Sequence, residues 1–317
     1  MDKTGVLIEM RDGKLKPSNL AVCSAASRGD GECIALLLDD NESAVGATLQ
    51  DYGVDSVVKI EADDRAIPWN PEAWTAAIMQ AMAHYGIATL LGLASVKGKI
   101  LLAGVAAALD APLVMDCTAV DLDRHAAVKP QFSGKALAEF VTHGERHIYG
   151  LRPNALPAVK APRQSRVETF QATIGSSRTT VLNVRKGASD RVDLTEANVI
   201  ISGGRGMANG DNFGILHECA RPLSAAVGAS RVAVDAGWVS HTMQVGQTGK
   251  TVTPKVYIAC GISGSVQHFA GMKTAGLIIA VNTDPQAAIM QKCDYAVCAD
   301  LFDIIPALTR KLQKTAD

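Results

Sequence analysis

Aromatic residues are scarce in this sequence, making up 4% of its 317 residues. Hydrophobic residues as a whole still reach 48%, so Ala, Val, Ile and Leu must fill the interior. A core of such side chains suits helices layered on a parallel sheet. The length is enough for two domains of ordinary size, and we expect an α/β protein.

Long apolar runs and a surplus of charge are also missing. The hydrophobic stretches are too short, and too broken by Gly and Pro, to span a bilayer, so we expect no direct membrane insertion. The formal net charge of -1 argues against a nucleic-acid binder that works through a broad positive field. The first residues, MDKTGVLIEMRDGKL, predict a strand and a turn rather than a signal or transit peptide.

The cysteines lack the spacing of a metal site. Cys293 and Cys298 are five residues apart, with no second pair and no histidine close by, so no metal is expected. The other five are predicted to be reduced thiols in apolar surroundings, namely Cys23, Cys33, Cys117, Cys219 and Cys260. Reduced thiols and the missing signal peptide together predict a cytoplasmic protein.

The first half of the chain alternates strand and helix patterns. Apolar strand runs at 33–38 and 56–61 alternate with helical patterns such as 71–86, which has an acid early and a glycine late. After Asp121 the segments become shorter and β-like. We predict a first domain over residues 1–190 and a second over 191–317, with a charged linker near 185–195.

The strand–helix alternation returns in the second domain. The predicted strands are 198–204, 231–237, 255–260, 276–282 and 294–300. The predicted helices are 213–227, 265–272, 285–291 and 302–314. In both domains this alternation predicts a mostly parallel, doubly wound sheet with helices on both faces.

Polar residues and glycines follow at least four strands of the second domain. Ligands of open parallel sheets bind beyond the carboxyl ends of the strands, where helix N-termini also favour anions. We therefore predict a site for a phosphate-bearing ligand at this edge. The residues that point to it are Arg205, Ser230, Arg231, Gln244, Gln247, Thr248, Gly261, Ser263, Gly264, His268, Asn282 and Asp300.

Each of these residues has an ordinary structural explanation when it is taken alone. Asn282 and Asp300 are suited to cap helices, His268 to a satisfied interior position, and Arg231 to a surface ion pair. The loop with Gln244 and Thr248 reads equally as a solvated turn. Only the coincidence of several strand ends with ligand-type residues favours a binding site.

Several stretches closely resemble the alpha subunit of the electron transfer flavoproteins. They are GGRGM, AAVGASRVAVDAGW, QVGQTGKTVTPKVYIACGISGSVQHFAGM, AVNTDP and ADLFDIIPAL, which cover most of residues 197–312. In the first half the resemblance is looser and includes DCTAV and RPNAL. The chain departs from the family pattern at Thr283, where a lysine is usual, and at 265–266.

The resemblance implies an electron carrier that is a heterodimer with a beta subunit, which the first domain would dock. Its second domain would be Rossmann-like and hold FAD. The carrier would accept electrons from acyl-CoA-type dehydrogenases of fatty acid β-oxidation. It would pass them through a flavin semiquinone to a membrane quinone oxidoreductase. A bacterial cytoplasmic location and no substrate of its own are also implied.

The resemblance also implies roles for single residues. Arg231 would lie against the isoalloxazine ring, Thr248 would donate to its N5 atom, and His268 would approach its O2 atom. The remaining residues implied to contact FAD are Arg205, Ser230, Gln244, Gln247, Gly261, Ser263, Gly264, Gln267, Asn282, Asp300 and Leu301.

Two alternatives remain open from the sequence. One is an electron-bifurcating relative that uses NADH and ferredoxin through a second FAD in the beta subunit. The other is a non-redox module that binds a nucleotide for regulation.

Overall fold

The computed structural model describes residues 3–38, 43–184 and 192–316. Its chain divides into two compact units. The N-terminal unit comprises Met1–Gln131 and Leu137–Gly187, and the C-terminal unit comprises Phe132–Ala136 and Ala188–Asp317. Most of the predicted linker, residues 185–191, lies outside the described residues.

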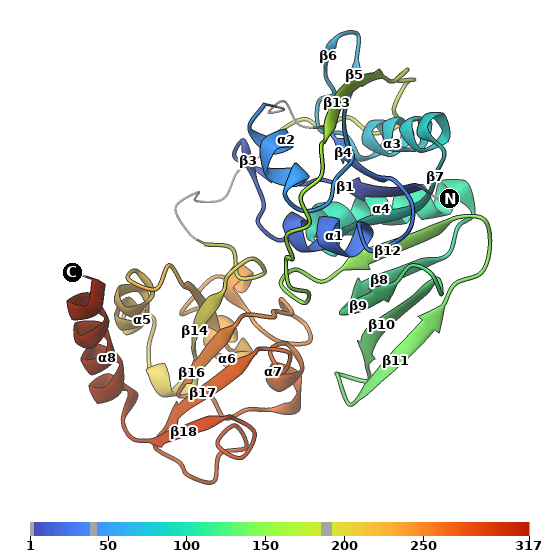
Figure 1. The fold of residues 1–317 in the computed structure, drawn as a ribbon. Helices are drawn as coiled ribbons and strands as arrows, with labels where there is room; N and C mark the ends of the chain where they lie inside the picture. Colours follow the sequence, from blue (N-terminus) through green and yellow to red (C-terminus); the bar gives the residue numbers. More distant parts are fainter. Residues whose placement is uncertain (1–2, 39–42, 185–191, 317) are drawn as a thin grey trace. The chain divides into compact units, whose positions relative to one another are not determined.

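The N-terminal unit is built on a sheet in the order β13-β5-β4-β1-β7-β12-β8, with β6 beside β5 (Figure 1). All neighbours along this order are parallel, and only β6 runs antiparallel to β5. Its strands are β1 (Lys3–Leu7), β4 (Cys33–Leu37), β5 (Ser56–Ala62), β6 (Arg65–Ala66), β7 (Ile87–Leu93), β8 (Leu113–Cys117), β12 (His147–Leu151) and β13 (Arg166–Gln171).

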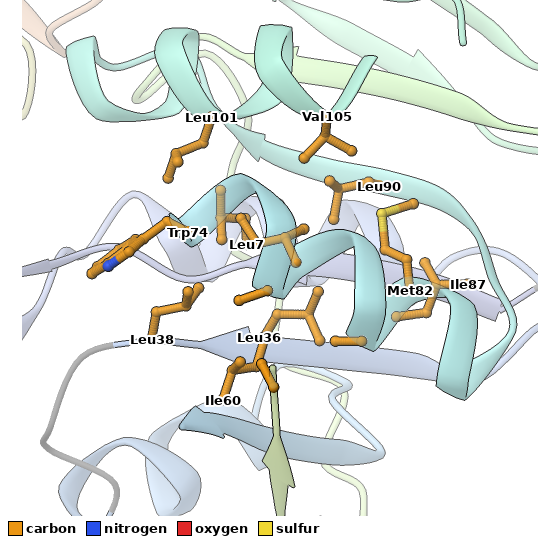
Figure 2. Packing of buried hydrophobic residues seen from close by; sticks show 14 of the residues in the cluster. Leu7, Leu36, Leu38, Ile60, Trp74, Met82, Ile87, Leu90, Leu101 and Val105 are labelled. Atoms are coloured by element: carbon orange, nitrogen blue, oxygen red, sulfur yellow. The ribbon is translucent and has the colours of Figure 1, made fainter. Parts of the chain in front are cut away.

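Alternate residues of these strands enter two cores on opposite faces of the sheet. Leu7 packs with α3 (Pro71–Tyr85) and α4 (Val96–Leu109), as Figure 2 shows. Its neighbour Val6 packs with α1 (Asn19–Ala26) and α2 (Ser43–Gln50) on the other face. Because successive side chains of a strand point to opposite faces, a strand covered by helices on both faces must be apolar throughout.

Helix α3 shows how the sequence sets the ends of such an element. The Asn70 side chain accepts from the backbone N–H groups of Glu72 and Ala73, at 2.9 and 3.1 Å. Pro71 occupies the first turn, where no backbone donor is needed. Gly86 ends the helix in the left-handed region, with φ of +69°.

Two small antiparallel elements accompany the large sheet. The chain changes character after Asp121 as predicted, forming a three-stranded sheet in the order β11-β10-β9. Its strands are β9 (Ala119–Asp121), β10 (Ala126–Gln131) and β11 (Ala136–Val141). A hairpin of β2 (Met10–Arg11) and β3 (Lys14–Leu15) follows the first strand.

The C-terminal unit has a fully parallel sheet in the order β15-β14-β16-β17-β18. Its strands are β14 (Val199–Gly203), β15 (Ala226–Ala229), β16 (Val256–Cys260), β17 (Leu277–Asn282) and β18 (Tyr295–Cys298). Its helices are η1 (Arg205–Met207), α5 (Phe213–Ala220), α6 (Arg231–Asp235), η2 (His241–Met243), α7 (Val266–Ala270) and α8 (Leu301–Ala316).

Two cores again lie on opposite faces of this sheet. Ile258 of β16 packs with α5 and α8, whereas Tyr257 packs on the side that Phe269 of α7 covers. The predicted α/β fold with mostly parallel, doubly wound sheets is confirmed.

Three predicted elements of the C-terminal unit are wrong. Residues 231–237 do not form a strand: the strand is β15, Ala226–Ala229, and Arg231 begins helix α6. The alternating valines at 232 and 234 imitate a strand pattern, but the Ser230 side chain caps the helix through the Ala233 N–H. Helix α5 ends at Ala220, before β15, and residues 285–291 form turns rather than a helix.

The cysteines and the longest helices bear on two further predictions. All seven cysteines are free, and the five predicted in apolar surroundings are buried. Among the described residues no cluster of metal-type side chains occurs. No helix in these parts of the chain is long and apolar enough to cross a bilayer.

Candidate functional site

A cavity of about 790 Å³ opens at the carboxyl ends of the C-terminal sheet, and all its lining residues belong to that unit. All five strands lead into it. Arg205 follows β14, Ser230 and Arg231 follow β15, and Ser263 follows β16. Asn282 ends β17, and Asp300 follows β18. Parallel strands end at one edge of a sheet, so residues far apart in the sequence meet here.

The cavity gathers all the predicted site residues except Gly264. They are Arg205, Ser230, Arg231, Gln244, Gln247, Thr248, Gly261, Ser263, Gln267, His268, Asn282, Asp300 and Leu301. Gly264 is not one of the lining residues; its φ is +79°, and a Cβ atom there would lie 2.5 Å from the Ile289 nitrogen. Glycine is required at this position because a side chain would clash with the backbone of Ile289.

Backbone-to-backbone packing also explains the glycines after β14 and β16. A Cβ atom on Gly206 or on Gly261 would lie 2.7 Å from the Cα atom of the other residue. The Gly206 N–H donates to the Gly261 carbonyl at 3.0 Å. These glycines let two strand-end loops touch, and the touching loops form the floor on which a ligand can lie.

The loop between η2 and β16 contributes a paired amide and hydroxyl. Gln244 is buried, and its Nε2 donates to Thr248 Oγ1 at 3.1 Å. Because the oxygen of Thr248 accepts this bond, its proton remains available to an acceptor in the cavity. The sequence alone reads equally as a solvated turn, but the structure folds it against the cavity.

His268 is a buried imidazole in the cavity wall. Its Nε2 lies 3.0 Å from the Tyr257 hydroxyl, and its Nδ1 is buried without a well-formed hydrogen bond in the described chain. Burial lowers the pKa of His268 to about 4, and the Val245 backbone opposes this shift. The imidazole is therefore neutral near pH 7.

Positive charge enters the cavity from Arg205 and Arg231. Arg231 lies in the first turn of α6, where its Nε donates to Asp235 at 3.1 Å. Both side chains of this pair are largely exposed, so the pair holds the guanidinium only weakly and leaves it free to meet a ligand.

The polar residues after β17 and β18 stabilise turns as well as lining the cavity. The Asp300 carboxylate accepts from the Phe302 N–H at 2.9 Å at the start of α8. Asn282 donates to the Ile262 carbonyl at 3.0 Å and accepts from the Asp284 N–H at the same distance. Capping and ligand contact are therefore compatible in these side chains.

Sequence reasoning missed part of the wall. The additional lining residues are Gly206, Val232, Val245, Gly246, Ile262, Ser265, Thr283, Asp284, Ala287, Ala299 and Phe302. Most are apolar or small and carry no ligand-type signature. Their one signal is that all of them except Asp284 and Ala287 adjoin a predicted site residue in the sequence.

The chain matches two protein-family models. Residues 4–174 match the electron transfer flavoprotein domain, and residues 193–273 match the electron transfer flavoprotein FAD-binding domain. The electron transfer flavoprotein subunit alpha of Bacillus subtilis is 35% identical over 98% of both chains. That of Pseudomonas aeruginosa is 38% identical, covering 96% of this chain and 98% of the other. Protein FixB of Clostridium saccharobutylicum is 34% identical over 96% and 94%. The chain therefore belongs to the electron transfer flavoprotein family, as an alpha subunit with FAD as its cofactor.

Proposed function

We propose that this chain is the FAD-carrying subunit of a heterodimeric electron carrier. It takes electrons from acyl-CoA-type dehydrogenases and passes them to a membrane quinone oxidoreductase. The main support is that five strand ends converge on one cavity in the unit that matches an FAD-binding domain.

The residues present fit FAD. The volume of about 790 Å³ lies in the range of cofactor cavities. Arg205 supplies a positive charge for a pyrophosphate. Asn282 and Asp300 are suited to ribose hydroxyls or an adenine edge. FAD, when bound, supplies the one- and two-electron redox chemistry.

The chain's own residues would tune that chemistry. Arg231 would place positive charge beside the flavin ring, and such a charge stabilises added electrons in a cavity of low dielectric. Thr248 would donate its free hydroxyl proton to the ring, held in place by Gln244. His268 would face the ring as a neutral group.

The N-terminal unit is proposed to dock the beta subunit. Leu137, Phe140 and Val141 of β11 are exposed apolar side chains on a short sheet. Leu137 and Val141 share one face of the strand, and exposed apolar side chains on one face are common where one protein binds another.

The proposal is tested on the heterodimer, made by co-expressing this chain with an electron transfer flavoprotein beta subunit. We expect a yellow complex with one FAD, whose absorbance bleaches with an acyl-CoA dehydrogenase and its substrate. A complex that stays colourless after soaking in FAD would refute the proposal. Two FAD molecules together with reduction by NADH would favour the bifurcating alternative, whereas the non-redox alternative does not fit the FAD-binding family match.

A further inference from the structure

We infer that Tyr257 is a positioning residue that fixes the tautomer and the orientation of His268 in the FAD site. The inference rests on the proposed function in one respect, which is that His268 faces the flavin. Tyr257 itself does not line the cavity.

The contact joins the sheet core to the cavity wall. Tyr257 lies in β16 with 0% of its surface exposed, and His268 in α7 has 5% exposed. The phenol oxygen is 3.0 Å from Nε2, and the two rings meet edge to face with centroids 6.1 Å apart. A phenol this deeply buried has few alternative positions, so it is a rigid support for the imidazole.

The surroundings of the phenol, which include Ser202 of the neighbouring strand β14, decide the direction of the hydrogen bond. The Ser202 side chain is also fully buried. Burial raises the pKa of Tyr257 well above its ordinary value, and Ser202 partly opposes this shift. The phenol therefore stays protonated. The buried Ser202 hydroxyl forms no well-formed hydrogen bond among the residues that the structure describes, so Nε2 of His268 is the acceptor left for the phenol proton.

Because a buried donor without an acceptor is costly, the phenol donates its proton to Nε2 of His268. A neutral imidazole has one N–H group, which must then be at Nδ1, beside the Val245 backbone. The hydrogen bond thus runs from the phenol to the imidazole.

In this arrangement His268 and Arg231 would have different electrostatic roles at the flavin. The imidazole can take a second proton at Nε2 only if the phenol loses the acceptor of its own buried proton. His268 then offers a fixed dipole, and Arg231 carries the positive charge on that part of the wall.

Tyr257→Phe tests the inference, because it removes the hydroxyl and keeps the ring. The tautomer is measured from ¹⁵N shifts of labelled histidine in the co-expressed heterodimer, with and without FAD, and His268→Gln assigns the signal. We expect Nδ1–H in the parent protein and a shift away from it in the variant. Flavin content should be retained, and the flavin potential should move upward because protonation of Nε2 becomes easier.

Tyr149→Phe is the matched control. Tyr149 is equally buried in the N-terminal unit, and its hydroxyl lies 2.6 Å from Thr142 Oγ1. This variant should change neither the His268 signal nor the potential. If Tyr257→Phe does not fold, a ring-fluorinated tyrosine at position 257 strengthens the donor and should move the signal in the opposite direction.

An unchanged His268 signal in either Tyr257 variant overturns the inference. So does a parent protein whose His268 proton is at Nε2. If the tautomer responds but the heterodimer takes up no FAD, the positioning role stands and the proposed function fails.

Discussion

At the scale of single residues, several polar side chains of the cavity also hold the chain's own structure. Asp300 caps α8, Asn282 braces a turn, and Arg231 pairs with Asp235. From the sequence, capping and ligand contact are competing explanations. The structure makes them compatible, because these side chains line the cavity while they cap or brace the backbone, and a side chain fixed in this way would meet a ligand with less loss of entropy.

Gly261→Ala should damage the floor of the cavity. The residue has φ of +60°, and the added Cβ would lie 2.7 Å from the Gly206 Cα atom. We expect a loss of roughly 1–3 kcal/mol in the free energy of unfolding and weaker FAD binding. Urea denaturation and FAD titration measure these effects.

The control for this change is Gly214→Ala. Gly214 is exposed in α5, and a Cβ atom there meets nothing within 4 Å. Stability should stay the same or rise by up to about 1 kcal/mol. Equal losses in both variants would contradict the role assigned to the Gly206–Gly261 contact.

His268 should make the stability of the protein without FAD depend on pH. Its pKa is about 4 in the folded chain, against 6.5 for the ordinary side chain. The unfolded state therefore binds more protons between these values, and stability is lost as the pH falls through this window. The loss is on the order of 3 kcal/mol by linkage.

His268→Gln should flatten this part of the pH profile. Comparing urea denaturation of the two proteins from pH 7 to pH 4 separates the histidine from the carboxylates, which both proteins share. Parallel profiles would show that the imidazole is not held neutral.

At the scale of elements, the sequence indicates most strands and helices but not all their boundaries. The apolar runs of β4 and β16 and the capped pattern of α3 are predicted closely, because burial on both faces and capping leave plain signatures. Strand β15 was missed because its sequence, AVGA, has little β character. The contacts between Gly206 and Gly261 and between Tyr257 and His268 join separate elements, so no local pattern shows them.

Helix α3 should lose stability in Asn70→Ala. The side chain satisfies two backbone N–H groups at the helix start. Its removal should cost about 1 kcal/mol. Chemical denaturation measures the loss, and Asn70→Asp, which keeps the accepting oxygen, should retain most of the stability. A large loss in both variants would mean that the bond from Asn70 to the Thr179 carbonyl matters more than the cap.

At the scale of the whole molecule, the cavity wall belongs to one unit, so FAD should stabilise that unit selectively. Free FAD at 100 times its Kd should add about 2.7 kcal/mol to the stability of the C-terminal unit. Trp69 and Trp74 lie in the N-terminal unit, and Trp238 lies in the C-terminal unit.

The three tryptophans allow each unit to be followed by fluorescence during thermal unfolding. Trp238→Phe reports on the N-terminal unit, and the double change Trp69→Phe with Trp74→Phe reports on the C-terminal unit. FAD should raise the unfolding temperature seen by the second reporter only. An equal rise for both reporters would show that the two units unfold as one.

The residues of the cavity wall are synthesised one after another over a long stretch of the chain. Its lining runs from Arg205 to Phe302, and each strand of the sheet adds a part. While the ribosome is still making β17, the nascent polypeptide has only part of the cavity wall. Uptake of FAD is therefore a late step of biogenesis, which begins only after Phe302 has emerged and α8 has started to fold.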